Sequence, residues 1–136
     1  MTASRNEANH ALARAYFAAV TAGELPDALC CDDMTAWITT GDATMDKASY
    51  QMVIRLLARM CATPIQFTID AITAEEDRVV AEARSTATLI SGEAYANTYV
   101  FSFRIRDGKF ASIAEHYNAL EVQEKLLPLM KQLGTG

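Results

Sequence analysis

The sequence has no excess of basic residues, no long apolar run and few cysteines. Its 136 residues carry a net charge of -5 without a basic cluster, so the chain lacks the positive surface that binds nucleic acid or an anionic membrane. No apolar run approaches the length of a membrane span, and the N-terminus has no apolar segment of the kind found in secretory signals. We therefore expect neither nucleic acid nor a membrane as a partner.

The cysteines Cys30, Cys31 and Cys61 form an odd set without the spacing of a metal or redox site. Reduced, small hydrophobic side chains in a cytoplasmic protein account for them best. The sequence also contains no phosphate-binding loop, nucleophile elbow or cluster of metal ligands. No metal site is therefore expected.

Hydrophobic residues, by contrast, are abundant. They make up 51% of the chain, enough for one domain with its own core over residues 1–136. Ser4 and Glu7 have the spacing of a capping box and predict a helix that runs to about residue 22, where Gly23 can end it. A short helix is expected from near Pro26 to residues 30–31, before a strand over residues 35–39.

A further helix is expected from Asp46, a plausible N-cap, to about Met60. Its expected inward residues are Met52, Val53, Leu56, Leu57 and Met60. Near the end of the chain, Asn118 begins a second capping-box pattern, and the terminal helix that follows should be kinked or ended by Pro128.

Strand patterns fill most of the second half of the chain. Residues 65–69 alternate, residues 79–88 form a second strand, and two long strands meet at Asp107-Gly108. Helices followed by a run of hairpin-joined strands predict an α+β fold, with helices packed on one face of a curved antiparallel sheet.

The length of the last turn decides which side chains meet across the final hairpin. A two-residue turn would place Tyr99 opposite His116 and mix apolar with small polar residues. A three-residue loop with a bulge would place Tyr99 opposite Glu115 and Phe101 opposite Ile113. Only the longer loop keeps the apolar rows on one face, so we prefer it.

Polar side chains interrupt these apolar rows at two positions. Asn97 lies in the row of the first long strand, and Glu115 lies between Ile113 and Tyr117 on the second. A polar group in an apolar row must find a partner or bind something. The preferred register brings Asn97, Tyr99, Glu115 and Tyr117 together at one end of the sheet. We therefore expect the functional site at that end.

Several segments resemble a known superfamily. Residues 14–25 and 31–37 resemble the opening of ketosteroid isomerases and SnoaL-like polyketide cyclases, and residues 95–99 and 106–118 resemble the SnoaL-like group again. Both belong to the nuclear transport factor 2-like (NTF2-like) superfamily, and the resemblance covers nearly the whole chain. It implies a cone-shaped α+β barrel with a buried apolar pocket, a homodimer, and no bound cofactor or metal.

The functional residues of ketosteroid isomerases carry over only in part. Tyr16 matches the tyrosine of their first helix that holds the substrate oxyanion. Their second oxyanion donor, a protonated aspartic acid, falls on Phe101, and their catalytic aspartate falls among residues 38–40, which contain no acid. The resemblance therefore does not imply ketosteroid isomerisation by that machinery.

Two other groups of the superfamily point to Glu115. Limonene epoxide hydrolases use an aspartate on the last strand, which falls on Glu115, together with an Arg-x-Asp pair that falls in reverse order on Glu82 and Arg84. SnoaL-type cyclases use a single acidic base in the pocket, and Glu115 can fill that role.

We therefore expect Glu115 to act as a general acid or base whose pKa is raised by an apolar pocket. Tyr16, Arg84 and Glu82 are the other candidate catalytic residues. The alternative for Glu115 is a structural ion pair with Arg84 across the sheet. The expected ligand contacts are Trp37, Asn97, Tyr99, Phe101, Ile113 and Tyr117.

Three functional hypotheses remain open at this point. The first is a cofactor-free isomerase, cyclase or hydrolase acting on a small apolar molecule that carries oxygen, such as a terpenoid, steroid-like or polyketide compound. The second is a non-catalytic ligand-binding module of the same fold. The third is a structural role in which the exposed sheet face serves only dimerisation.

Overall fold

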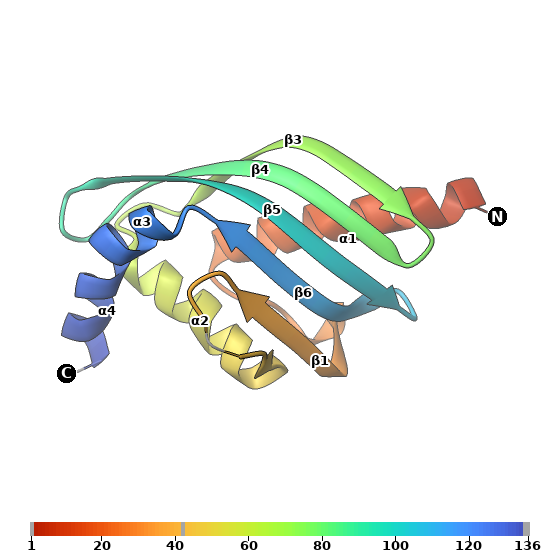
Figure 1. The fold of residues 1–136 in the computed structure, drawn as a ribbon, viewed down its shortest axis with the longest axis horizontal. Helices are drawn as coiled ribbons and strands as arrows, with labels where there is room; N and C mark the ends of the chain where they lie inside the picture. The colour runs from red at the N-terminus through yellow and green to blue at the C-terminus, as the bar shows by residue number, and fades with distance from the viewer. Residues whose placement is uncertain (1, 42, 135–136) are drawn as a thin grey trace.

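A curved six-stranded sheet with helices against its concave side forms the protein (Figure 1). The computed structural model describes residues 2–41 and 43–134, with side chains from residue 5 onward. The elements are α1 (Thr2–Ala22), a 3-10 turn η1 (Asp27–Leu29), β1 (Cys30–Ile38), β2 (Met45–Asp46), α2 (Lys47–Met60), β3 (Gln66–Glu75), β4 (Arg78–Thr88), β5 (Ala94–Arg106), β6 (Lys109–Tyr117), α3 (Ala119–Glu121), a π-helical turn η2 (Val122–Leu126) and α4 (Leu127–Gly134).

The predicted α+β class is confirmed, but the sheet is mixed and open. The strand order is β2-β1-β6-β5-β4-β3, and β1 pairs with β6 in parallel while the other neighbouring strands pair antiparallel. The consecutive strands from β3 through β6 are joined by short turns, which make each pair antiparallel. No such turn joins β1 to β6, so these two strands can pair in parallel. Because β2 and β3 are edge strands, the sheet is a cone rather than a closed barrel.

The first helix begins and ends close to the expected residues. It starts at Thr2, two residues before the expected cap Ser4, whose side chain lies outside the described residues. Gly23 ends it with a φ of +88°, and its N–H donates to the Val20 carbonyl at 3.0 Å. A Cβ on Gly23 would lie 3.0 Å from the Cβ of Ala58, so this glycine also allows α1 and α2 to approach closely.

Aromatic rings fill the space between α1 and the sheet. Tyr16 is 1% exposed, and its ring centroid lies 5.3 Å from that of Phe101 and 5.2 Å from that of Phe103. Phe17 and Phe110 complete this cluster from α1 and β6. Burial of each ring stabilises the fold by roughly 1.5–3 kcal/mol, so this cluster anchors the strands that carry the site.

The first strand is longer than predicted. The short helix expected to reach residues 30–31 is a single 3-10 turn that ends at Leu29, and Cys30 and Cys31 lie in β1. The short strand β2 (Met45–Asp46), which pairs with β1, was not predicted. All three cysteines are free thiols, two of them buried.

The second helix has the predicted bounds and a rotated inner face. The Asp46 carboxylate accepts a hydrogen bond from the Ser49 N–H at 2.8 Å, which confirms the N-cap. Met52 was expected inward but is 64% exposed, because the face turned to the core is centred on Tyr50 and Ile54.

The final hairpin has a two-residue turn rather than the three-residue loop we preferred. Asp107 and Gly108 both have positive φ, +55° and +73°, as a type I′ turn requires, and Arg106 pairs with Lys109. The extra residue lies within β6 instead, where Ala111 has no partner and forms a bulge.

This bulge changes the register but not the faces. Glu115 pairs with Phe101 and Tyr117 pairs with Tyr99, two residues away from the expected pairing. A shift of two residues leaves every side chain on the same face of the sheet. The prediction that Tyr99, Glu115 and Tyr117 share the inner face at one end of the sheet is therefore kept.

The C-terminal segment is helical throughout its described part. The side-chain Oδ1 of Asn118 accepts a hydrogen bond from the Leu120 N–H at 3.1 Å, as the predicted cap requires. Pro128 was expected to kink or end the helix, but it lies in the first turn of α4, directly after the π turn, where its missing N–H is tolerated. Within the described residues, no helix is long and apolar enough to cross a bilayer.

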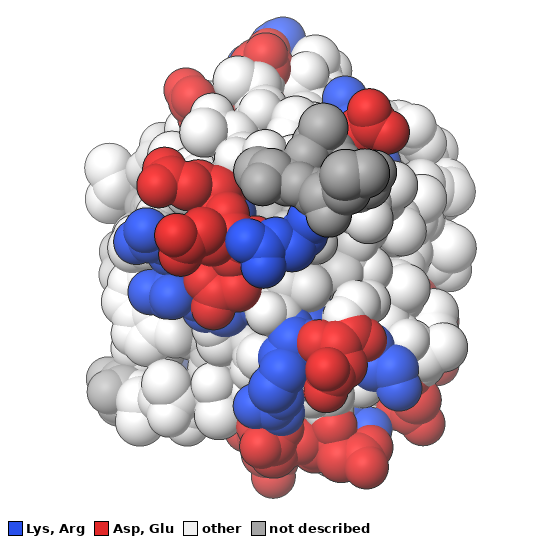
Figure 2. All heavy atoms as spheres, turned by 90° about the vertical axis from the view of Figure 1, so that its right-hand side faces the viewer, with Lys and Arg blue, Asp and Glu red and all other residues white. Residues whose placement is uncertain are grey.

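The end of the sheet that carries the β3–β4 and β5–β6 turns has intermixed charges, as Figure 2 shows. Arg104 lies 3.6 Å from Asp77, and Arg106 forms an ion pair with Asp33. Acidic and basic groups thus neutralise one another on this face, in line with the absence of a basic cluster in the sequence.

Candidate active site

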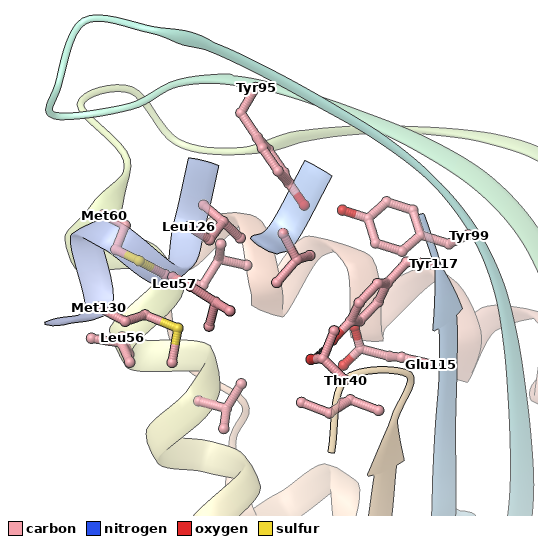
Figure 3. Close-up of a pocket in the computed structure, with 14 residues that line it drawn as sticks. Thr40, Leu56, Leu57, Met60, Tyr95, Tyr99, Glu115, Tyr117, Leu126 and Met130 are labelled. Atoms are coloured by element: carbon pink, nitrogen blue, oxygen red, sulfur yellow. Dashed lines mark hydrogen bonds between the residues drawn. The ribbon is translucent and has the colours of Figure 1, made fainter. Parts of the chain in front are cut away.

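A pocket lies at the opposite end of the sheet, between β5, β6, α2 and α4 (Figure 3). Its volume is about 130 Å³. The apolar end lies between the helices and is formed by Leu56, Leu57, Met60, Leu126, Leu127 and Met130. The polar end lies at the strands and is formed by Thr40, Tyr95, Tyr99, Glu115 and Tyr117. The π turn η2 presents Leu126 to the pocket, and such turns often occur at functional sites.

Strand geometry explains why Glu115 faces the pocket. Successive side chains of β6 alternate between faces, so Ile113, Glu115 and Tyr117 point inward while His116 points outward. The neighbouring strands place Phe101 and Ile38 beside Glu115 in the sheet. Glu115 is thus fixed by backbone pairing on both sides.

Burial gives Glu115 the properties of an acid or base near neutral pH. Its side chain remains partly accessible through the pocket, yet protein surrounds the carboxyl, and burial raises its pKa to about 7. A hydrogen bond from the Tyr50 hydroxyl opposes this rise. At neutral pH the group is therefore divided between its charged and neutral forms.

A chain of buried hydroxyls ends on Glu115. Tyr50 donates to Oε2 of Glu115, and the Tyr16 hydroxyl lies 2.6 Å from that of Tyr50. Because the single Tyr50 proton goes to the carboxylate, Tyr16 is the donor to Tyr50. Burial raises the pKa values of both tyrosines well above their usual range, so both stay protonated at neutral pH.

Sequence reasoning did not identify Tyr50. The available signal was its spacing, since residues 50, 53 and 57 lie on one face of a helix capped by Asp46. Tyr16 was expected to contact the ligand, but it lies behind Tyr50 in the aromatic core and does not line the pocket. Tyr16 therefore reaches Glu115 only through Tyr50.

Thr39 and Thr40, which follow β1, hold β6 in place around Glu115. The Thr39 N–H and its hydroxyl both donate to the Glu115 carbonyl, at 3.1 and 3.0 Å. The hydroxyls of Thr40 and Tyr117 lie 2.6 Å apart at the pocket wall. These contacts fix the backbone and the neighbours of Glu115.

A second group of hydroxyls lies on β5 and the neighbouring strand β4. The Tyr99 hydroxyl lies 2.7 Å from that of Ser85, and Tyr95 accepts a hydrogen bond from Asn97 at 2.8 Å. Asn97, which was expected to contact the ligand, is 4% exposed and lies behind Tyr95 rather than on the pocket wall. Tyr99 does line the pocket, and so does Tyr95, which we had not singled out.

Glu82 and Arg84 lie on the outer face of β4, away from the pocket. Both are exposed, and Arg84 forms a two-pronged ion pair with Asp70 at 2.9 Å. The ion pair considered between Arg84 and Glu115 is therefore not formed. Alternation along β4 gives the reason, because its inward residues are Ala81, Ala83 and Ser85.

Three expected ligand contacts also lie elsewhere. Trp37 is on the outer face of β1, where its ring lies 4.9 Å from that of His116, and Ile38 takes the inward position. Phe101 and Ile113 are 1% exposed and belong to the core beneath the pocket. Tyr117, in contrast, lines the pocket as expected.

The pocket suits proton transfer on an uncharged apolar molecule. Its described lining contains one carboxyl and four hydroxyl groups but no lysine, arginine or histidine. Among the described residues, no group of three or more histidine, cysteine or acidic side chains could hold a metal ion. The polar groups of this lining are the Glu115 carboxyl and its neighbouring hydroxyls.

Comparisons with known proteins agree with the fold. The profile of the SnoaL-like domain matches residues 13–113, and no curated protein sequence matches the chain. PrhC from Penicillium brasilianum NBRC 6234 has a TM-score of 0.78 at 17% identity, over 94% of this chain and 91% of that one. An NTF2-like protein from Anabaena variabilis ATCC 29413 has a TM-score of 0.73 at 23% identity, over 82% and 87%.

A candidate SnoaL-like polyketide cyclase from Jannaschia sp. CCS1 has a TM-score of 0.72 at 15% identity, over 88% of this chain and 92% of that one. At such identities the structures establish a shared fold, and the profile match over most of the chain establishes the family. The chain belongs to the SnoaL-like family and has the NTF2-like fold.

Proposed function

We propose that the protein is a cofactor-free isomerase or cyclase that moves a proton on a small apolar molecule carrying oxygen. The observation that carries this proposal is the Glu115 carboxyl, which faces an apolar pocket, is hydrogen-bonded by Tyr50 and has a pKa of about 7. A general acid or base works best when its pKa lies near the working pH. Glu115 then serves as base in one step and as acid in the next.

The step that fits these groups is proton abstraction beside a carbonyl. The Glu115 carboxylate takes a proton from the carbon next to the carbonyl, and the electrons of that C–H bond form an enolate. In an isomerase, Glu115 returns the proton to a different carbon. In a cyclase, the enolate carbon attacks a second carbonyl of the same molecule, and the proton goes to the new alkoxide.

The size of the pocket favours a compact substrate. Its volume of about 130 Å³ is close to that of an engineered apolar cavity of roughly 150 Å³ that binds benzene. Among terpenoid, steroid-like and polyketide compounds, this volume favours those with one or two rings. The apolar end between α2 and α4 would hold the ring skeleton, and the polar end would hold the oxygen.

The hydrolase hypothesis is the weaker form of this proposal. Epoxide hydrolysis by the related enzymes needs an acid–base pair besides the last-strand carboxylate, and Glu82 and Arg84 lie on the outer face of β4. Glu115 alone would then have to activate water and protonate the epoxide. Isomerase or cyclase chemistry needs only one such group.

A non-catalytic ligand-binding module is the second candidate. The observation that favours it is the hydrogen bond from Tyr50, which already provides Glu115 with an internal partner. In that case the pocket would bind the same class of molecule and release it unchanged.

The experiment that separates these candidates is a thermal-shift screen of wild type and Glu115→Gln. Steroids, terpenoids, epoxides and polyketide-like aromatics are tested, and each stabilising compound is then analysed for conversion. The proposal predicts a compound that stabilises both proteins and is converted only by wild type. A compound bound by both proteins and converted by neither would make the protein a binding module.

We also propose that the chain forms a homodimer through the outer face of its sheet. Val80 and Val100 are 38% and 43% exposed there, and Val100 pairs across the strands with His116, which contacts Trp37. Val80 and Val100 are diagonal neighbours on this face, and exposed apolar side chains that lie close together are typical of an interface. The family resemblance, which implies a homodimer, is in line with this proposal.

A further inference from the structure

We propose that the Tyr95 hydroxyl is the hydrogen-bond donor to the oxygen of the ligand, from the side of the pocket opposite Glu115. This inference rests on the proposed function, because it takes the ligand to be an oxygen-bearing molecule next to Glu115. Tyr95 lies at the start of β5, and its hydroxyl points into the polar end of the pocket (Figure 3).

The amide of Asn97 has only one orientation that satisfies its neighbours. Its Oδ1 accepts hydrogen bonds from the backbone N–H groups of Thr98, at 2.8 Å, and Asn118, at 2.9 Å. Both partners are donors, so the opposite side of the amide must be the NH₂ group. That group donates to the Tyr95 hydroxyl oxygen at 2.8 Å.

The hydroxyl of Tyr99 adds a second contact to Tyr95. It lies 2.7 Å from the Ser85 hydroxyl and points toward the Tyr95 hydroxyl in Figure 3. When Ser85 donates to Tyr99, the Tyr99 proton is available to the Tyr95 oxygen. The Tyr95 oxygen accepts from Asn97, and this contact does not use the Tyr95 proton. Burial raises the pKa of Tyr95, so that proton is present at neutral pH.

The Asn97 contact thus holds the Tyr95 oxygen in place and leaves its proton available to a ligand in the cavity. Donors arranged in sequence polarise one another, so the last hydroxyl of such a chain donates more strongly than an isolated one. A preorganised donor of this kind stabilises the negative charge that develops on a carbonyl oxygen during enolate formation.

Tyr117 is the other hydroxyl that could meet a ligand, and its position argues against this role. It lies two residues from Glu115 on the same face of β6, beside the base, and its hydroxyl contacts Thr40 at 2.6 Å. A ligand with its C–H toward Glu115 would turn its oxygen away from that strand, toward Tyr95.

The test compares 1-indanone with indane, which share a two-ring skeleton and differ by one carbonyl. Dissociation constants for both are measured by NMR titration of wild type, Tyr95→Phe and Tyr117→Phe, and the carbonyl stretch of bound 1-indanone is measured by infrared spectroscopy. Tyr95→Phe is expected to weaken 1-indanone binding about tenfold and indane binding less than about twofold. It should also raise the carbonyl frequency, while Tyr117→Phe leaves the frequency unchanged.

Three results would overturn the inference. In the first, wild type binds 1-indanone no more tightly than indane. In the second, Tyr95→Phe weakens the binding of both probes equally. In the third, Tyr117→Phe rather than Tyr95→Phe raises the carbonyl frequency. An equal effect on both probes would mean that Tyr95 only shapes the pocket.

Deuterium exchange into the carbon next to the carbonyl of 1-indanone, in D₂O, reports the proposed function separately. It should be lost in Glu115→Gln, which retains the Tyr95-dependent carbonyl frequency. If wild type catalyses no exchange but Tyr95 still sets the frequency, the proposed chemistry fails and the inference stands. If exchange occurs and Tyr95 has no effect, only the inference fails.

Discussion

Glu115 has a pKa of about 7 in the folded protein, above the 4.5 of an ordinary glutamate. Between these values the folded state binds more protons than the unfolded state, so this group's contribution to stability falls as the pH rises through about 7. Glu115→Gln is therefore expected to be more stable than wild type by up to about 3 kcal/mol near pH 8, with little of that gain near pH 5. Urea unfolding at both pH values measures the difference, and a gain that does not change with pH would contradict the raised pKa.

Tyr50 controls the carboxyl through its hydrogen bond. Because that bond stabilises the carboxylate, Tyr50→Phe is expected to raise the pKa of Glu115 above about 7. Tyr16→Phe is the matched control, since Tyr16 acts only through Tyr50 and should shift the pKa less. The measurement is the pH dependence of the Glu115 carboxyl infrared band in each variant. Equal shifts in the pKa of Glu115 in both variants would mean that the hydrogen-bonded hydroxyls of Tyr16 and Tyr50 do not reach Glu115 in the order described.

At the residue scale, the sequence predicted the base better than its partners. The alternation along β6 was enough to place Glu115 and Tyr117 inward. Trp37 was misplaced because its strand is apolar at Met34, Ala36 and Ile38 as well, so composition did not show which face is inward. Tyr50 was missed because its partner Glu115 is 65 residues away, and only the folded chain brings the two together.

At the scale of the elements, the turn between β5 and β6 sets the register of the site. Gly108 has a φ of +73° with open space around its Cα, so a substitution meets backbone strain rather than a clash. Gly108→Ala is expected to destabilise the protein by about 1 kcal/mol. Asp107→Asn is the control, since asparagine tolerates the left-handed region and should leave stability nearly unchanged. Chemical denaturation measures both, and equal losses would contradict a type I′ turn.

The same hairpin shows where element-level prediction stops. The residues Asp107 and Gly108 are typical of a two-residue turn. Keeping the apolar rows of both strands on one face, however, requires one extra residue somewhere in the hairpin. Both requirements hold, because the extra residue is Ala111 within β6. A bulge has no residue signature comparable to that of a turn, so the sequence alone left its position open.

At the scale of the whole molecule, the homodimer proposal makes a prediction about mass. The chain has a mass of 14.9 kDa, and light scattering should give twice that value. Val100→Arg is expected to give a folded monomer, because the new side chain lies opposite Glu82 within its own sheet and places a charge in the interface. A monomeric wild type, or a dimer unaffected by this substitution, would contradict the proposed interface.

The overall architecture followed from the order of patterns along the chain. Helical periodicity comes first and strand alternation second, which is enough to predict an α+β fold with helices on one face. The parallel pairing of β1 with β6 joins segments about 80 residues apart and depends on long-range packing. Local patterns carry no information about such a pairing.

The central claim is that Glu115 exchanges protons near neutral pH inside an apolar pocket. A ¹³C NMR titration of the glutamate carboxyls, with Glu115→Gln to identify the resonance, tests it without any substrate. The account predicts a midpoint near 7. A midpoint near 4.5 would contradict it, because Glu115 would then be an ordinary carboxylate, fully charged at neutral pH.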